Sequence, residues 1–164
     1  MKSIILSYSD AGGAGRAAIN IYKSLQEFNV DIEVCVKKKI TDLNYVKNFY
    51  KKNFFIFDKY KEKINRNIGK FKKKKTFSYQ SPSVFPTNLS KNLNKTNHDI
   101  IHLCWINEFL SIEDIGRIKK PIIWSLCDMW PFSGINHYEE YDENVFWRTK
   151  IHERFSKFSI DKWI

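Results

Sequence analysis

The chain has 164 residues, of which 43% are hydrophobic and 16% aromatic, so it holds enough apolar side chains for one domain with a buried core. It contains no run of about 18 apolar residues, so no membrane-spanning helix is expected, and its N-terminal apolar run is too short for a secretory signal peptide. Three cysteines in separate contexts, Cys35, Cys104 and Cys127, do not make a disulfide framework. We therefore expect a cytoplasmic protein with a single domain over residues 1–164.

Apolar runs and helical periodicity alternate along the chain. Non-alternating apolar runs predict buried strands near 2–8, 31–36, 99–105 and 121–127. Periodic apolar side chains predict helices over 14–28 and near 57–71, and the two prolines of 81–89 predict a loop. A further helix is expected over 111–118, because Ser111 lies three residues before Asp114, as in a capping box. This alternation predicts an α/β fold, a parallel sheet with helices on both faces.

The formal net charge of +10 comes from one segment. Residues 37–75 carry 15 Lys/Arg and three acidic side chains, a net charge of +12, whereas the rest carries 13 Lys/Arg and 15 acidic side chains. The segment ends in a lysine cluster: Lys70, Lys72, Lys73, Lys74 and Lys75. Such a patch attracts anionic membranes, nucleic acid or phosphorylated substrates, although no nucleic-acid recognition motif accompanies it. The alternative is a solvated face without a partner.

Three segments that follow predicted strands bring together the residues of a candidate site. They are the glycine corner (residues 9–18, SDAGGAGRAA), the segment from Cys104 to Asn107, and the segment from Cys127 to Trp130. Ligands of parallel sheets bind beyond the carboxyl ends of the strands. We therefore expect these segments to meet at one edge of the sheet.

The glycine corner has the composition of a phosphate-binding turn. Small residues let backbone amides face a ligand, and a helix N-terminus adds partial positive charge. Gly13, Gly15 and Ala18 satisfy the loose G-x-G-x-x-A dinucleotide pattern, whereas the absence of a following Gly-Lys-Ser/Thr excludes a P-loop. With Lys37 at the end of the second strand, an NADP-type domain is one alternative. Another is that tight packing alone explains Gly12 and Gly13.

Histidine and cysteine chemistry offers weaker alternatives. His102 lies within an apolar strand and is expected to be a core histidine, while His98 and His152 are expected at the surface. A metal site would draw on Cys104, Cys127 and His137. A Cys–His nucleophile pair would consist of Cys127 and His137. The spacing of the three residues matches no zinc pattern, and we expect no metal.

The tryptophans divide between core and rim. Trp105 and Trp124 lie in or beside predicted strands, which favours core packing. Trp130 and Tyr138 lie near proline and glycine and are better placed for stacking on a sugar.

The segments SDAGGAGRAA, DIIHLCWINEFLS, KPIIWSLCDMWPFSGINHY and SIDKWI resemble, in this order, the N-terminal half of bacterial family 4 glycosyltransferases of the GT-B fold. The subgroup that builds surface polysaccharides such as colanic acid and lipopolysaccharide is the most similar. The resemblance covers most of the chain and is poor over 37–80. The stretch from Trp124 to Gly134 is its specific part.

The resemblance implies a retaining transfer of a sugar from a nucleotide-sugar to a lipid-linked or saccharide acceptor. It places the donor diphosphate at the glycine corner (Gly12, Gly13, Gly15 and Arg16) and the reacting sugar beside Asp128 and Cys127. The acceptor rim would then comprise Trp105, Asn107, Trp130, His137 and Tyr138. No cofactor is implied beyond the nucleotide-sugar itself.

Two positions depart from the family pattern, since Cys127 and Cys104 stand where histidines are usual. The family also has a second Rossmann-like domain that holds the nucleotide, so we expect the 164 residues to be incomplete alone, with 139–164 leading toward that domain or a partner chain supplying it. Peripheral association with the inner membrane face is expected through the lysine cluster. The alternatives are the NADP-type domain and a non-catalytic basic module that binds anionic membrane or nucleic acid.

Overall fold

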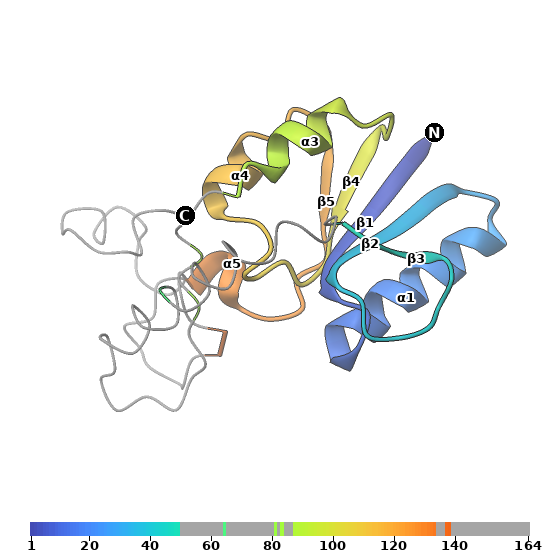
Figure 1. Cartoon of the computed structure of the whole chain (residues 1–164), viewed down its shortest axis with the longest axis horizontal. Coiled ribbons are helices and arrows are strands. Elements are labelled where there is room, and N and C mark those ends of the chain that lie inside the picture. Colours follow the sequence, from blue (N-terminus) through green and yellow to red (C-terminus); the bar gives the residue numbers. More distant parts are fainter. Residues whose placement is uncertain (50–63, 65–80, 82, 84–86, 134–136, 139–164) are drawn as a thin grey trace.

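The computed structural model describes residues 1–49, 64, 81, 83, 87–133 and 137–138 (Figure 1). Their centre is a five-stranded sheet in the order β3-β2-β1-β4-β5, in which every pair of neighbours is parallel. The strands are β1 (Lys2–Ser9), β2 (Asp31–Lys38), β3 (Val46–Asn48), β4 (Ile100–Leu103) and β5 (Ile122–Trp124). The predicted α/β class with a parallel, Rossmann-like sheet is confirmed.

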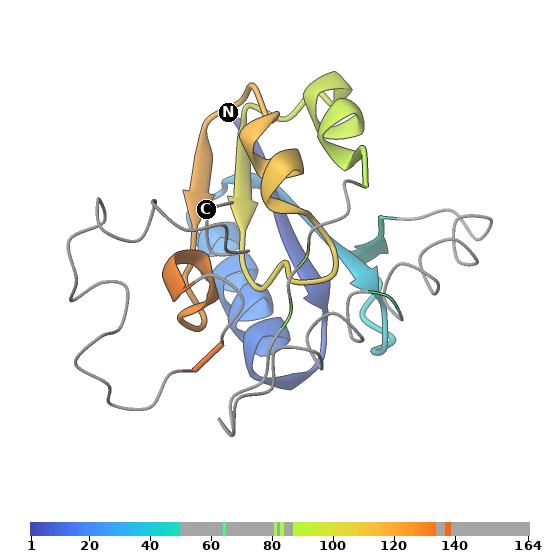
Figure 2. The ribbon, with the colours of Figure 1, turned by 90° about the vertical axis from the view of Figure 1, so that its left-hand side faces the viewer.

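Helices cover both faces of the sheet. Helix α1 (Gly12–Glu27) packs on one face over β1 and β2, while α3 (Leu89–Lys95) and α4 (Ile112–Gly116) lie on the other (Figures 1 and 2). A short helix, α5 (Trp130–Ser133), follows β5. Each face has its own apolar cluster, one built around Ile5, Val34 and Ala18 and the other around Leu6, Leu103 and Phe109.

The start of α4 is as the sequence predicts. Ser111 caps the helix by accepting a hydrogen bond from the Asp114 backbone N–H at 3.0 Å, and the Asp114 carboxylate accepts the Ser111 hydroxyl at 2.8 Å. The same carboxylate also accepts the backbone N–H of Thr87 at 2.6 Å. Burial alone would raise the pKa of Asp114, but these hydrogen bonds hold it below its ordinary value. The buried carboxylate thus joins α4 to the start of α3.

Four predicted strands occur where the apolar runs place them, and β3, α3 and α5 are additional. Helix α3 begins at the end of the segment predicted as a loop. Apart from residue 64, the helix expected near 57–71 lies outside the described residues, as does the lysine cluster Lys70–Lys75. Within the described part of the chain, no helix is long and apolar enough to cross a bilayer.

The outer strand β5 has three residues, and the side chains of two of them are exposed. Its neighbour in the described sheet is β4, and Ile122 and Ile123 are 37% and 51% exposed. Trp124 by contrast packs against the apolar cluster under α3 and α4.

The strand order defines a crevice. From β1 the chain crosses through α1 to β2 on one side, and β4 pairs with β1 on the other. The strand order therefore reverses between β1 and β4, and the carboxyl ends of these two strands flank the crevice in which open α/β sheets bind ligands.

Candidate functional site

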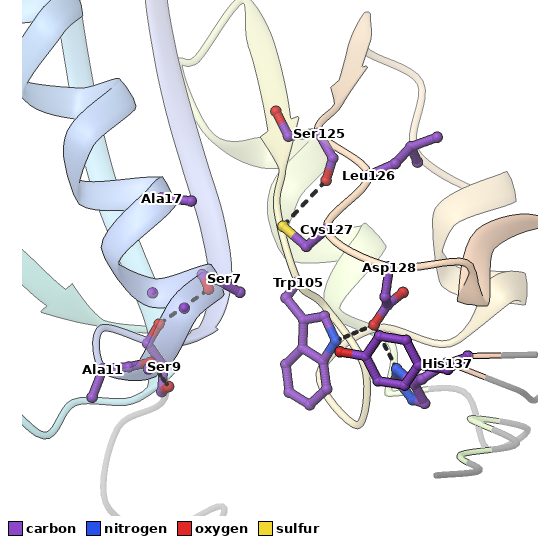
Figure 3. A pocket seen from close by; sticks show the side chains of 15 residues that line it. Ser7, Ser9, Ala11, Ala17, Trp105, Ser125, Leu126, Cys127, Asp128 and His137 are labelled. Atoms are coloured by element: carbon purple, nitrogen blue, oxygen red, sulfur yellow. Dashed lines mark hydrogen bonds and ion pairs between the residues drawn. The ribbon is translucent and has the colours of Figure 1, made fainter. Parts of the chain in front are cut away.

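A pocket of about 710 Å³ lies at this reversal of strand order (Figure 3). One wall is the end of β1 and the start of α1, including residues 11–15. The other wall is Trp105 after β4, residues 125–128 after β5, and the pair His137 and Tyr138. The three segments expected to meet are therefore brought together around one cavity.

The glycine-corner wall offers backbone donors. Helix α1 begins at Gly12, its N-cap Ala11 makes no side-chain capping bond, and its first turn holds no acidic residue. The first four N–H groups of a helix have no partner within it; here these are the N–H groups from Ala11 to Ala14. Together with the helix dipole they form a cradle for an anionic group.

The three glycines of the corner differ in their backbone conformation and surroundings. Gly12 has a φ of +76°, a conformation that disfavours other residues. A Cβ on Gly15 would lie 2.6 Å from the Asp10 carbonyl carbon and 2.8 Å from the Ser9 carbonyl oxygen. A Cβ on Gly13 would meet nothing within 4 Å. Tight packing thus explains Gly15, whereas the alternative that it explains Gly12 and Gly13 is not supported, because a Cβ at either would meet nothing within 4 Å.

Asp10, which the sequence analysis did not single out, supports the corner from behind. It is 2% exposed, and its carboxylate accepts the backbone N–H of Ile40 at 2.7 Å, the N–H of Thr41 at 3.0 Å and the Thr41 hydroxyl at 2.5 Å. Burial alone would raise the pKa of Asp10, but these bonds lower it below its ordinary value. Asp10 therefore ties the loop after β2 to the corner. A carboxylate directly before a glycine-rich helix start was its only sequence signal.

The two basic residues considered near this wall do not line the pocket. Arg16 is exposed on α1. Lys37 is buried, donates to the backbone carbonyl of Glu108, and lies 5.7 Å from the centre of the Tyr8 ring. These contacts give Lys37 a structural role, so the NADP-type alternative gains no support from it.

The opposite wall is a network of side chains centred on Asp128. Its Oδ2 accepts the Trp105 indole N–H at 2.6 Å and lies 2.5 Å from His137 Nδ1 (Figure 3). Its Oδ1 accepts the Trp130 backbone N–H at 3.0 Å. Burial alone would raise the pKa of Asp128, but hydrogen bonds from His137 and Trp105 lower it below its ordinary value. The wall therefore presents a fixed carboxylate beside an indole.

A second layer of residues supports His137 from behind. Its Nε2 lies 2.5 Å from the Ser81 hydroxyl and 2.9 Å from the Asn107 side-chain nitrogen. Trp130 is buried and donates its indole N–H to the Ser81 carbonyl at 2.7 Å. The structure thus corrects two predicted rim residues: Trp130 and Asn107 are core residues that do not line the pocket, because both are turned toward this support.

Trp105 and Tyr138 do line the pocket, and Tyr138 is largely exposed. The expectation of core packing for Trp105 holds only in part, since its indole is half-buried and bounds the cavity.

The hydrogen-bonded row that runs from Ser81 through His137 to Asp128 has the order of a hydrolytic triad. However, Ser81 and His137 are 2% and 1% exposed, and Ser81 does not line the pocket. A nucleophile must reach its substrate. The arrangement therefore serves to hold Asp128 rather than to attack a ligand.

Cys127 lines the pocket, and its sulfur lies 3.6 Å from the Ser125 carbonyl oxygen. Partial burial and the neighbouring Asp128 raise the pKa of Cys127, which favours the thiol over the nucleophilic thiolate. His137 is already bonded to Asp128, so the Cys–His pair is not supported. Among the described residues, no group of three or more His, Cys, Asp or Glu side chains is arranged to hold a metal ion.

The predicted position is confirmed for one of the other histidines and wrong for a second. His102 is buried in β4 and lies 2.8 Å from the Ser125 hydroxyl, which confirms a core histidine. His98 is only 7% exposed, so its expected place at the surface is wrong. It packs near Glu33 of β2, which is paired with Lys2 of β1 and with Lys47 of β3. His152 lies outside the described residues.

Comparison of the chain with family models, curated proteins and solved structures gave no match.

Proposed function

We propose that this chain is the acceptor-side domain of a retaining glycosyltransferase that uses a nucleotide-sugar to build cell-surface polysaccharide or lipopolysaccharide. One observation carries the proposal, namely the pocket at the reversal of strand order, bounded by the glycine corner and by Trp105 and Asp128. The resemblance of the segments around these residues to family 4 glycosyltransferases supports the same reading.

The two walls suit two adjoining parts of a nucleotide-sugar, the diphosphate and the sugar. The N–H groups at the start of α1, which have no partner within the helix, favour the anionic diphosphate. A carboxylate held by three donors accepts hydrogen bonds from sugar hydroxyls and repels phosphate. The faces of Trp105 and Tyr138 offer apolar surface for a sugar ring.

The chemistry at this wall is positioning rather than covalent. Asp128 stays a carboxylate at neutral pH because its pKa is lowered, so it orients a hydroxyl or stabilises the positive charge that develops at the anomeric carbon. Cys127 contributes a thiol where the family usually has an imidazole, and a thiol is only a weak hydrogen-bond donor. We infer slow transfer or a changed donor preference relative to relatives with histidine.

A titration of tryptophan fluorescence tests the proposal. UDP- and GDP-sugars are expected to bind the 164-residue chain weakly and without turnover, since the family places the nucleotide pocket in a second domain. Gly13→Leu should abolish this binding, because the open space at Gly13 lets a side chain fill the cradle without a clash. Gly116→Leu is the matched control at another glycine with open surroundings. Tighter binding of NADPH than of any nucleotide-sugar would overturn the proposal, as would binding that Gly13→Leu leaves unchanged.

A further inference from the structure

We propose that His137 is a positioning residue: its ring, held between Ser81 and Asp128, keeps the Asp128 carboxylate on the Trp105 indole at the pocket wall. His137 was expected at an acceptor rim, but it is 1% exposed, and its ring nitrogens are turned toward protein groups. Its role therefore lies in how it places its neighbours.

The hydrogen bonds assign the ring a specific tautomer. Nδ1 lies 2.5 Å from the Asp128 carboxylate, which can only accept, so Nδ1 carries a proton. Nε2 lies 2.5 Å from Ser81, whose hydroxyl can donate to it. Asn107 places its side-chain nitrogen 2.9 Å from Nε2 and 3.3 Å from Nδ1, and because Nε2 is the accepting nitrogen of this tautomer, the Asn107 amide is a second donor to Nε2. The three contacts together fix the position and orientation of the imidazole.

The fixed ring determines what Asp128 can do. Its Oδ2 is occupied by two donors, His137 and the Trp105 indole, whereas its Oδ1 accepts one described donor, the Trp130 backbone N–H. A carboxylate oxygen accepts two hydrogen bonds, so the donors among the described residues leave one accepting position on Oδ1. We assign this position to a hydroxyl group of the ligand, and this assignment alone rests on the proposed function.

His137 also holds the turn that carries Asp128. Its backbone carbonyl accepts the Met129 N–H at 3.1 Å. Among its described hydrogen-bond partners, Asp128 is the charged one, while Ser81 and Asn107 are neutral. The proton on Nδ1 is therefore held by a charge-assisted bond.

The Trp105 indole N–H signal in a ¹H–¹⁵N spectrum measures this positioning without a ligand. The chain has five tryptophans, and Trp105→Phe identifies the signal. A short bond to a carboxylate shifts the proton downfield, and Asp128→Ala gives the position of the signal without that bond. Because the protein is observed unliganded, failure of nucleotide-sugar binding would leave this result intact.

Two amide substitutions at His137 provide the decisive contrast. The side-chain nitrogen of Asn reaches about as far as Nδ1, and that of Gln about as far as Nε2. We expect His137→Asn to leave the Trp105 signal near its original place, and His137→Gln to move it most of the way to the Asp128→Ala position. His102→Gln is the matched control, since His102 also bonds a serine hydroxyl through Nε2, and it should leave Trp105 unmoved.

The result that overturns the proposal is a Trp105 signal that His137→Gln leaves in place, or that the Asn and Gln variants move equally. If His137→Gln fails to fold, as loss of the other indole signals would reveal, the Ser81→Ala variant tests the proposal instead. It removes the Ser81 hydroxyl from Nε2 without touching Asp128. An upfield shift of the Trp105 signal in the same direction supports the proposal, and an unmoved signal refutes it.

Discussion

The two walls of the pocket are held in place by opposite means. The glycine corner has almost no side chains and offers backbone N–H groups, with its support, Asp10, hidden behind it. The Asp128 wall offers side chains, and its support is a second layer of side chains from three separate segments. The corner is therefore sensitive to added atoms, whereas the Asp128 wall is sensitive to lost partners.

Gly15→Ala should have the largest effect on stability. The added methyl would lie within 3 Å of backbone atoms of Ser9 and Asp10, which cannot move aside as a flexible side chain would. We expect the free energy of unfolding to fall by about 3 kcal/mol. Urea denaturation measures the change, and Gly116→Ala, with open surroundings, should not reduce stability. A Gly15→Ala protein as stable as the wild type would contradict the strict packing of the corner.

Asp128→Ala should come next, at about 2 kcal/mol, because it leaves the buried His137 and the Trp105 indole without their acceptor. The matched control is Asp99→Ala, which removes an exposed carboxylate that accepts the Lys2 backbone N–H, and it should cost less. Equal losses for the two variants in thermal or urea unfolding would mean that the network adds nothing beyond an ordinary surface bond.

Acid should lower the free energy of unfolding by protonating the carboxylate that supports each wall. The pKa values of Asp10 and Asp128 are lowered by the hydrogen bonds that outweigh their burial, so each carboxylate contributes stability above its ordinary pKa of 3.8. That contribution is lost as the pH falls through the lower folded-state value. Asp10→Asn and Asp128→Asn should each flatten the fall in unfolding free energy below pH 4. A protein with both substitutions should keep a residual dependence of unfolding free energy on pH. The reason is Glu33, because hydrogen bonds from Lys47 and Lys2 lower its pKa to about 2. An unchanged slope in both single variants would contradict this prediction.

Gly13→Ala should have the smallest effect on stability and the opposite sign. Alanine suits a helix better than glycine, and the added methyl meets nothing, so we expect a gain of about 0.5–1 kcal/mol. The same methyl stands in the cradle and should weaken nucleotide-sugar binding. Calorimetric unfolding and a binding titration on one sample check both effects. A gain in stability with undiminished binding would show that no ligand approaches the corner at Gly13.

The sequence predicted the sheet well because its strands are continuous apolar runs, and it predicted the start of α4 because a capping box is local. It did not predict β3, whose three residues include only one buried side chain, Val46. It also misplaced Trp130, His98 and Asn107, because their burial depends on partners distant in the chain: Ser81 for Trp130, Glu33 for His98 and His137 for Asn107. Motif spacing identified which segments meet, but it carried no information on which side chains turn toward the cavity.

The exposed isoleucines of β5 have a consequence for how the protein behaves in concentrated solution. Among the described residues β5 is an edge of the sheet, where a strand can offer backbone groups to another chain, and Ile122 and Ile123 add apolar surface there. Two features limit that risk: the strand spans only three residues, and the preceding Pro121 has no N–H to donate. Self-association through this edge would therefore rely on contact between side chains more than on backbone pairing, and its strength would depend on the two isoleucines.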